Sequence, residues 1–431
     1  MTQQRIHHVI GGGTRVHVAP HFSFSAEAYG GAARFIHEEL QKAGADSQLH
    51  LTRMADPASS RLDTPDDVAS LMRDLTADPA TQIVFFSPAI VDFRPAAQNV
   101  TGKYSPKFDS RSAPPQLVLA PVEKILPTIR TERKDIFLVG FKTTSGALPH
   151  EQYAAALNTL KASHANLMLA NDVRTRMHMI VTPEESFYEQ TTDRKAALSA
   201  LVRIALARAG LTYTRSTVLE DEPRVAWDND DIAPNLREVV DYVIAHGGYK
   251  PFRGKTAGHF AARGVEKGEF LTSARGEDFN RLDETGLVRV FAHGDDEVIA
   301  HGARPSVGGQ SQRIIFDLNP QLSNIVHFHC PMAISPADDI PVRAQWMYEC
   351  GSHECGQNTA DGMREVVPGI HAVMLENHGP NIAFGRNVPA QRVIDFIERN
   401  FDLGGKTGYL LDPPQRAMPH GASALAAPGV Q

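Results

Sequence analysis

Short apolar runs alternate with segments of helical periodicity throughout the first half of the chain. The apolar runs, each interpreted as a strand, lie at 9–10, 82–86, 136–139, 167–169 and 179–181. The helical segments, in which apolar residues recur every three or four positions, lie at 32–43, 64–76, 153–162 and 195–209. Strands and helices that alternate in this way are typical of a parallel sheet covered by helices on both faces. We therefore predict a Rossmann-like, three-layer α/β domain over residues 1–212, with ligands bound at the carboxyl ends of its strands.

A change of pattern marks the start of a second domain. The segment 213–235 is rich in Asp, Glu and Pro and has no apolar period, so we expect it to be a linker. A helix is predicted from Pro234 to Ile244, and the second domain is expected over 236–411. The final segment, 412–431, is a mixture of Ala, Gly and Pro with no apolar pattern to pack, and it is predicted to be disordered.

Three histidines in the second half suggest a metal site. Asn324 and the β-branched residues Ile325 and Val326 lead directly into His327-Phe328-His329, and residues two apart on a strand point to the same face. A second apolar run at 372–375 ends in a turn that carries His378. Three neutral imidazoles leave one coordination position of a divalent ion open, as in catalytic zinc sites. The alternative for such a pair of histidines on a strand is a packed or surface pair without a metal.

Composition and charge exclude several classes of function. With 42% apolar and 22% charged residues over 431 positions, the chain is an ordinary globular protein of two or three domains. A net charge of -7 provides no basic surface for nucleic acid. No run approaches the roughly 20 apolar residues of a membrane helix, and the first residues lack the apolar stretch of a signal peptide. We therefore expect a cytoplasmic protein, and the three cysteines argue against a disulfide framework.

The second half, from about 247 to 409, resembles the class II aldolase/adducin family, which implies a class II aldolase-like α/β/α domain. In that family a His-x-His strand and a later histidine bind the metal, usually zinc, so the resemblance implies His327, His329 and His378 as ligands. His259 lies in a segment that resembles the family's Gly-Asn-x-Ser-x-Arg loop. The segment 270–276 resembles a second loop, and the two loops hold a substrate phosphate or carboxylate. The residues implied for substrate binding are His259, Thr272, Ser273 and Arg275.

The chain departs from the family pattern at the catalytic base. Class II aldolases carry a glutamate about nineteen residues before the His-x-His strand, where this chain has Gly308 with Gln310 nearby. A glutamine cannot titrate, so the proton relay must use another group. Glu349 or Glu354 is the candidate base, since related dehydratases use a glutamate in this region. The alternative is that either carboxylate caps a helix or orients a metal-bound histidine.

The first half, from 5 to about 212, resembles the synthetase domain of the phosphopantothenoylcysteine synthetase family. That family activates a carboxylate with CTP and couples it to an amine. The matching segments are the opening Gly-Gly-Thr-Arg loop, a Phe-Ser turn, an Asp-Phe-Arg motif, a following lysine, a Val-Gly-Phe strand and an Ala-Asn-Asp motif. They imply a nucleotide site made of Gly12, Gly13, Thr14, Ser23, Asp92, Lys103, Phe141, Asn171 and Asp172.

The cofactors of the first half follow from the same resemblance. It implies Mg²⁺ together with CTP or ATP. His21 and Thr144 differ from the family's residues. The flavin-binding decarboxylase half that often precedes this synthetase is missing, so no flavin is expected.

Together the two halves suggest a bifunctional biosynthetic enzyme: a nucleotide-dependent carboxylate–amine ligase-like domain fused to a metal-dependent lyase-like domain, both acting on small molecules. In one alternative only the second half is catalytic, as an aldolase, epimerase, dehydratase or decarboxylase, and the first half binds nucleotide or dimerises. In another, the chain is a non-catalytic scaffold like adducin. Both families usually form homo-oligomers, so we expect one here.

Overall fold

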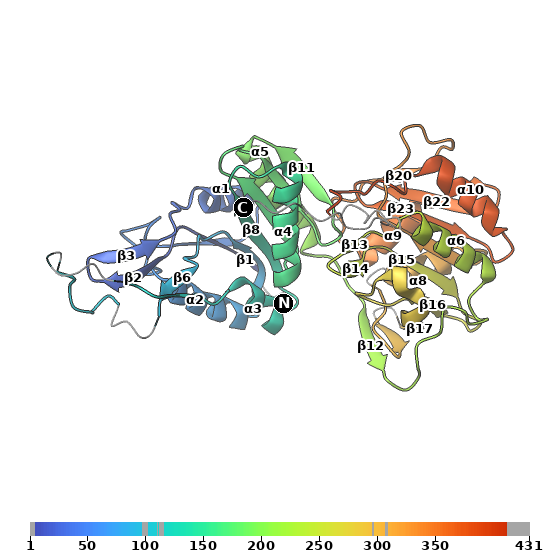
Figure 1. Ribbon diagram of the computed structural model, residues 1–431, viewed down its shortest axis with the longest axis horizontal. Coiled ribbons are helices and arrows are strands. Elements are labelled where there is room, and N and C mark those ends of the chain that lie inside the picture. The colour runs from blue at the N-terminus through green and yellow to red at the C-terminus, as the bar shows by residue number, and fades with distance from the viewer. Residues whose placement is uncertain are drawn as a thin grey trace, which may run out of the picture.

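The computed structural model describes residues 5–96, 102–109, 111, 116–294, 297–306 and 309–411, the side chains of 309–311 excepted. The predicted disordered tail at 412–431 and Gly308 lie outside these residues. The chain forms two α/β lobes side by side (Figure 1), which confirms the predicted fold class. Each lobe is built on its own large sheet.

The sheet of the first domain has seven strands in the order β11-β10-β9-β8-β5-β1-β4. Its strands are β1 (Ile6–Gly11), β4 (Ser47–Leu51), β5 (Thr81–Phe86), β8 (Phe137–Thr144), β9 (Leu167–Asp172), β10 (His178–Val181) and β11 (Phe187–Thr191). Strands β4, β1, β5, β8 and β9 are parallel, as predicted. Strands β10 and β11 are antiparallel, which differs from the uniformly parallel sheet we expected. Only a short turn follows β9, too short for the crossover that a parallel strand needs.

Helices cover both faces of this sheet. Two helices pack on one face, α1 (Gly31–Lys42) and α5 (Arg194–Arg208). Three pack on the other, α2 (Pro65–Ala77), α3 (Leu126–Glu132) and α4 (Pro149–Ser163). Two hairpins extend from the domain, β2 (Arg15–Ala19) with β3 (Phe22–Ser25), and β6 (Phe93–Pro95) with β7 (Leu119–Pro121). The three predicted layers are therefore present.

The second domain holds a ten-stranded sheet, mainly antiparallel, in the order β12-β18-β17-β16-β15-β19-β23-β22-β20, with β21 paired to β22. Its strands are β12 (Arg215–Leu219), β15 (His259–Arg263), β16 (Glu269–Ser273), β17 (Leu287–His293), β18 (Glu297–His301), β19 (Asn324–His327), β20 (Val342–Arg343), β21 (Arg364–Val367), β22 (Ile370–Leu375) and β23 (Gly379–Phe384). A small separate hairpin joins β13 (Pro251–Phe252) and β14 (Lys255–Thr256).

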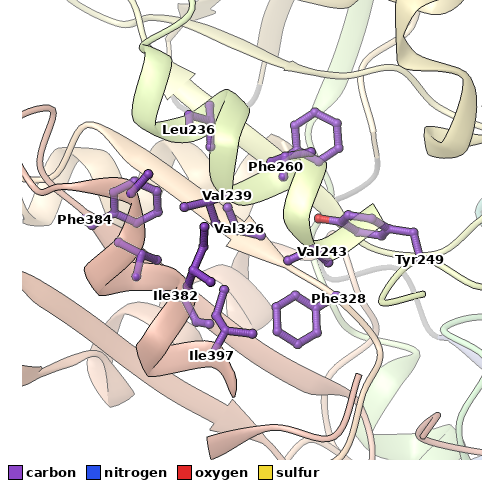
Figure 2. Close-up of a cluster of buried hydrophobic side chains, with 14 of the residues drawn as sticks. Leu236, Val239, Val243, Tyr249, Phe260, Val326, Phe328, Ile382, Phe384 and Ile397 are labelled. Atoms are coloured by element: carbon purple, nitrogen blue, oxygen red, sulfur yellow. The ribbon is translucent and has the colours of Figure 1, made fainter. Parts of the chain in front are cut away.

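Successive side chains of each strand point to opposite faces of this sheet, and a different pair of helices covers each face. Val326 and Ile382 face α6 (Pro234–Ala245) and α10 (Ala390–Asn400), forming the buried cluster that Figure 2 shows. Ile325 and its neighbours face α8 (Gly309–Leu318) and α9 (His353–Gly362). The short helix α7 (Leu282–Thr285) lies between strands β16 and β17 in sequence. The predicted α/β/α layering is confirmed.

The segment expected to be a linker is part of the second domain. Strand β12 pairs in parallel with β18, Val225 forms a bridge with Leu287, and Trp227 is buried. The side chains of β12 are exposed along its whole length. A strand held only by backbone hydrogen bonds at a sheet edge leaves no apolar pattern in the sequence, which is why the prediction differed.

The second domain meets the first at the amino-terminal edge of the first sheet. Asn166, just before β9, donates to Glu349 at 3.0 Å. The turn between β10 and β11 lies at the same edge, because Val181 pairs with Met168 near the start of β9. The carboxyl ends of the parallel strands therefore lie at the opposite edge, and Figure 1 shows the β2–β3 hairpin extending away from the second domain.

Candidate metal centre and nucleotide-binding edge

The three predicted ligand histidines converge. His327 is the last residue of β19, His329 follows in the segment beyond the strand, and His378 lies in the turn between β22 and β23. Because β23 pairs with β19, this turn is next to the end of β19. One ligand atom of each ring lies within 4.8 Å of those of the other two, and all three side chains are buried.

Gly379 allows the turn that carries His378 to lie close to the His-x-His segment. Gly379, directly after His378, has a φ of 148°, and a Cβ on it would lie 2.1 Å from the carbonyl oxygen of Phe328. The turn therefore packs on the backbone of the His-x-His segment. The ring centroids of His329 and His378 are consequently 4.7 Å apart.

The ring nitrogens of the triad that make no hydrogen bond are in the neutral state that a metal ligand requires. The carbonyl of Pro380 accepts a hydrogen bond from Nδ1 of His327 at 2.7 Å, so Nε2 carries the lone pair. That Nε2, Nδ1 of His329 and both nitrogens of His378 are buried without a hydrogen-bond partner among the described residues. Burial lowers the pKa of His327 to about 4 and moves those of His329 and His378 in the same direction. Neutral, unpartnered imidazoles fit a divalent cation.

His259 is a fourth buried imidazole beside the triad. It pairs with His327 across strands β15 and β19, and the two ring centroids lie 4.8 Å apart. Nε2 of Gln312 lies 2.7 Å from Nδ1 of His259, and Thr272 donates its hydroxyl to Oε1 of Gln312 at 2.7 Å. An amide nitrogen only donates, so Nδ1 of His259 accepts and its Nε2 carries the proton. His259 is therefore held as a donor rather than a metal ligand.

Gln312 is a residue that the sequence did not single out. It lies on α8 with its side chain fully buried. The nearby Gln310, which we had named, has its side chain outside the described residues, and Gly308 lies outside them altogether. No local signal distinguishes Gln312 from any other polar residue of an amphipathic helix.

The predicted substrate loop is assembled at the end of β16. The hydroxyl of Thr272 donates to Gln312, whereas the Oγ atoms of Ser273 and Ser306 are buried and have no hydrogen-bond partner in the part of the chain that the structure describes. Burial, and secondarily the neighbouring Arg304, lowers the pKa of Arg275. Two adjacent arginines and two free hydroxyls suit an oxyanion.

The two candidate base residues make their hydrogen bonds at the domain junction. Glu349 accepts from Asn166 of the first domain, and burial raises its pKa. Glu354 is in the first turn of α9 and accepts from the amide and hydroxyl of Thr212 at 3.1 and 2.9 Å. Glu354 thus lies at the start of the helix, as in the capping alternative, but the hydroxyl of Ser352 caps α9 and Glu354 bonds Thr212 instead.

The nucleotide-binding residues predicted for the first domain fall into two groups. Gly12 and Gly13 follow β1, Phe141 lies on β8, and Asn171 is near the end of β9, so they share the carboxyl edge of the sheet. Thr14 sits beside them, although its hydroxyl is used internally: it donates to the carbonyl of Ala89 at 3.1 Å. These residues span the edge where α/β sheets bind ligands.

Asp172 differs from these residues, because its side chain makes hydrogen bonds within the domain. Asp172 is buried and accepts from the amides of Gly146, Ala147, Arg174 and Thr175 and from the hydroxyl of Thr144. Burial acts to raise the pKa of Asp172, but these donors together hold it well below its usual range. Its carboxylate therefore fixes two loops at the edge.

Asp92, Ser23 and Lys103 lie around the projecting hairpins. Asp92 forms an exposed ion pair with Lys124 at 2.5 Å, and Ser23 is on strand β3. Lys103 lines a cavity of about 460 Å³ together with Arg53, Arg61 and Arg94. The three arginines were not among the predicted site residues.

Comparison with known proteins agrees with the two-part architecture. Residues 248–394 match the model of the Class II Aldolase and Adducin N-terminal domain, and this stretch contains the triad, His259 and Gln312. The L-fuculose 1-phosphate aldolase of Glaciozyma antarctica PI12 is 16% identical, with a TM-score of 0.29, over 42% of this chain and 75% of that one.

The first half is similar to proteins of coenzyme A biosynthesis. It is 25% identical over 170 residues to the coenzyme A biosynthesis bifunctional protein CoaBC of Thermococcus kodakarensis, and this similarity covers 38% of this chain and 41% of that protein. A DNA/pantothenate metabolism flavoprotein from Streptococcus pneumoniae is 22% identical with a TM-score of 0.40, over 47% of this chain and 99% of that one. None of the helices in the described part of the chain has the length and apolar character needed to cross a membrane.

Proposed function

We propose that this protein is a bifunctional small-molecule enzyme, with a CTP- or ATP-dependent carboxylate–amine ligase-like domain and a metal-dependent, class II aldolase-like lyase domain. One observation carries the second activity: the buried, unpartnered ring nitrogens of His327, His329 and His378 lie within 4.8 Å of one another. These residues would hold a divalent ion, with zinc favoured by an all-imidazole donor set. When bound, such an ion polarises the carbonyl and hydroxyl oxygens of a ketol.

The surrounding residues supply binding and hydrogen bonds. Nε2–H of His259 donates to a substrate oxygen next to the triad, because Gln312 holds the opposite nitrogen as an acceptor. Ser273 and Arg275 bind the anionic group of the substrate, a phosphate or carboxylate. Because Nε2 of His259 carries a proton, it donates to the substrate and does not compete with the substrate for the metal.

Glu349 is the better of the two proposed proton carriers. Its raised pKa brings it closer to neutral pH, where a base must both take and release a proton. Both oxygens of each carboxylate accept hydrogen bonds, from Asn166 in Glu349 and from Thr212 in Glu354, so the raised pKa of Glu349 is what distinguishes them. Gln310 cannot titrate, and its proposed contribution is limited to hydrogen bonding.

In the first domain, the carboxyl edge of the sheet would bind the nucleotide. Gly12 and Gly13 let the backbone approach phosphate, Asn171 donates to the activated carboxylate, and Phe141 packs near the base. Lys103, with Arg61 beside it in the same cavity, would neutralise the triphosphate together with Mg²⁺. Asp172 acts by positioning the loops.

A second candidate function has a specific observation behind it. The hydroxyl of Thr144, where the synthetase family carries an acid, is tied to Asp172 at 2.8 Å. A first domain without that acid could bind nucleotide or form a dimer without ligase chemistry. A purely structural, adducin-like role has less support, since a scaffold has no use for unpartnered buried imidazoles.

A proton-exchange measurement tests the proposed lyase. Zinc-loaded protein in D₂O should exchange a carbon-bound hydrogen of dihydroxyacetone or its phosphate, because enediolate formation removes that proton. The exchange should be lost in His327→Ala and retained in His371→Ala, a half-buried histidine on β22 that lies outside the triad. Equal exchange by both variants would contradict the proposed role of the triad.

A further inference from the structure

Two of the three histidines of the triad lie outside regular strands. His327 ends β19 and is held in the sheet, where it pairs with His259 of β15 and Asn381 of β23. His329 lies beyond the end of β19, and His378 lies in the turn between β22 and β23. Sheet pairing therefore fixes the backbone of His327, whereas the other two histidines need further contacts to hold them in place.

Thr407 bonds the backbone of both of these histidines. Its amide donates to the carbonyl of His329 at 3.1 Å, and its hydroxyl donates to the carbonyl of His378 at 2.7 Å. Only 8% of Thr407 is exposed, so both hydrogen bonds are shielded from water and are correspondingly strong. Because one residue spans the two carbonyls, Thr407 fixes the separation of the two segments that carry His329 and His378.

Thr407 belongs to a segment that leaves the second domain and packs on the first. We call residues 402–411, which follow α10, the strap. The strap starts on the second domain, where the amide of Asp402 donates to the carbonyl of Pro331 at 3.0 Å. Its end packs on the first domain, where Tyr409 contacts the buried cluster between the sheet and helices α2, α3 and α4. Thr407 lies between these two attachments.

The residues on either side of Thr407 are held by Glu185, in the turn between β10 and β11 of the first domain. Lys406 forms an ion pair with Glu185 at 2.6 Å, and the two side chains are only 4% and 5% exposed. Gly408 lies against the carbonyl of Glu185, where a Cβ would come within 2.5 Å, and its φ of 93° favours glycine. The first domain therefore fixes the backbone both before and after Thr407.

Tyr409 is the anchor of the strap on the first domain. Its ring stacks on that of Phe187, with the centroids 5.1 Å apart, and lies 5.5 Å from the ring of Tyr153. Tyr153 is fully buried on α4 and donates its hydroxyl to the carbonyl of Glu185 at 2.6 Å. Aromatic pairs of this kind stabilise a contact beyond the area that they bury. The strap is thus attached to the core of the first domain.

The turn between β10 and β11 also contacts the turn that carries His378 directly. Ser186 donates its hydroxyl to the carbonyl of Asn377, the residue before His378. The carbonyl of Ser186 in turn accepts from the amide and the hydroxyl of Thr182, at 3.0 and 3.1 Å, and this closes the first-domain turn. The first domain therefore holds the backbone at His378 in two ways, through the strap and through Ser186.

We propose, on the basis of the metal-dependent function above, that Thr407 is a positioning residue that holds His329 and His378 at the spacing a metal ion needs, and that the first domain fixes Thr407 through the strap. Both donors of Thr407 bond ligand carbonyls, so it acts on the metal through the ligands. Ligands that are already in place bind a metal more tightly than ligands that must first be ordered. The metal centre of the second domain is then complete only with the first domain docked, whether or not the first domain has an activity of its own.

The first test loads the full chain with Co²⁺, because the visible absorption of bound Co²⁺ reports the geometry of its ligands. Thr407→Val removes the hydroxyl and keeps the size of the side chain. This variant should shift the Co²⁺ bands and bind Co²⁺ and Zn²⁺ about tenfold or more weakly, as expected when a partner of a ligating histidine is lost. Thr407→Ser keeps the hydroxyl and should restore both. Thr76→Val is the control, because it removes a buried hydroxyl that donates to the carbonyl of Met72 on α2 at 2.7 Å, and it should bind metal as the wild type does.

The second test loosens the strap at its anchor, and it keeps the proposal testable if Thr407→Val does not fold. Tyr409→Leu removes the stacking on Phe187 in the first domain. Because the strap connects this contact to the triad, we expect shifted Co²⁺ bands and weaker metal binding here too. Tyr409→Phe keeps the ring and loses only the hydroxyl contacts with Gln190, so it should behave as the wild type. Circular dichroism of each variant checks that it is folded.

The possible results separate this proposal from the metal function itself. If Thr407→Val keeps the wild-type bands and affinity, Thr407 does not position the ligands, and the metal function stands. If Tyr409→Leu behaves as the wild type, the first domain does not act on the metal centre through the strap. If the wild type binds neither Co²⁺ nor Zn²⁺, the metal function is contradicted, and the positioning role of Thr407 with it.

Discussion

Gln312 donates its side-chain amide to Nδ1 of His259 at 2.7 Å and thereby leaves the ring proton on Nε2, beside His327. This one bond decides whether the fourth imidazole of the site ligates the metal or donates to the substrate. Thr272 fixes the orientation of the amide, because its hydroxyl donates to the amide oxygen. The three residues come from β15, α8 and β16 and act as one unit.

The tautomer of His259 is directly measurable. In ¹⁵N NMR spectra of zinc-loaded protein, Nδ1 of His259 should resonate as an unprotonated nitrogen and Nε2 as a protonated one. Gln312→Leu should relax this preference, since it removes the donor and keeps the volume. A protonated Nδ1 in the wild type would mean that the amide is reversed and that His259 is free to ligate the metal.

His259→Leu, which removes the donor, should slow proton exchange into a bound ketol without weakening metal binding. Loss of a single preorganised donor to a developing oxyanion typically costs about 10²–10³-fold in rate. The rate is measured by NMR exchange and the bound metal by elemental analysis of the same sample. Loss of metal in this variant would place His259 among the ligands instead.

Gly379→Ala should disrupt the metal site through the backbone. The new Cβ would overlap the carbonyl of Phe328, and a φ of 148° is strained for any other residue, at a cost of about 1–3 kcal/mol. We expect lower stability in urea and weaker zinc binding. Gly385→Ala is the control, because the nearest atom to its Cβ is 3.4 Å away and its backbone conformation is ordinary. Equal behaviour of the two variants would show that the turn does not position His378.

The first domain should lose stability in mild acid because of His8. Burial, with smaller contributions from His50 and opposing ones from Asp78, lowers its pKa to about 4 from an ordinary value of 6.5. The unfolded state therefore binds the extra proton as the pH falls below 6.5, and stability drops until about pH 4. The slope for one proton is about 1.4 kcal/mol per pH unit. In urea unfolding between pH 7 and 4.5, the slope of stability against pH should be smaller by one proton in His8→Gln than in the wild type. An unchanged slope would show that His8 does not control the acid sensitivity.

Nucleotide binding by the first domain is testable with a matched pair of lysines. CTP or ATP with Mg²⁺ should raise the melting temperature of the wild type, since a ligand at 100 times its Kd stabilises by about 2.7 kcal/mol. Lys103→Ala, in the cavity that Arg61 and Asp67 also line, should reduce the shift with triphosphates more than that with monophosphates. Lys107→Ala, four residues away, should behave as the wild type. No shift with any nucleotide in the wild type would leave the first domain as a binding-inactive module.

Much of the fold is readable from the sequence, because strands such as β5 are short continuous apolar runs and helices such as α2 have a period of 3.6 residues. The triad was also predictable, because His327 at the end of β19 and His329 are two residues apart, and His378 closely follows the apolar run of β22. The predictions that failed concern strands whose position or direction leaves no pattern of apolar side chains in the sequence. Strand β12 is exposed along its length, and β10 looks the same whether it is parallel or antiparallel.

The rest of the site depends on contacts between distant segments. Gln312 meets His259 across 53 positions, and Arg208 meets the carbonyl of Trp346 only because the amino-terminal edge of the first sheet faces the second domain. Asp172 was predicted to bind nucleotide because its motif resembles that of the synthetase family. In the structure, however, backbone amides of the adjacent loops donate to its carboxylate oxygens. Glu349 and Glu354 likewise make their bonds across the domain junction, whose arrangement no local pattern encodes.

The most direct test of the account is the metal content of the purified protein together with that of His327→Ala. Elemental analysis should find one divalent ion, zinc above all, for each wild-type chain, and the variant should bind it more than about 100-fold more weakly, since two imidazoles cannot hold the ion tightly. A wild type that binds no divalent ion, or a variant that keeps a full equivalent, would contradict the metal centre on which the proposed lyase depends.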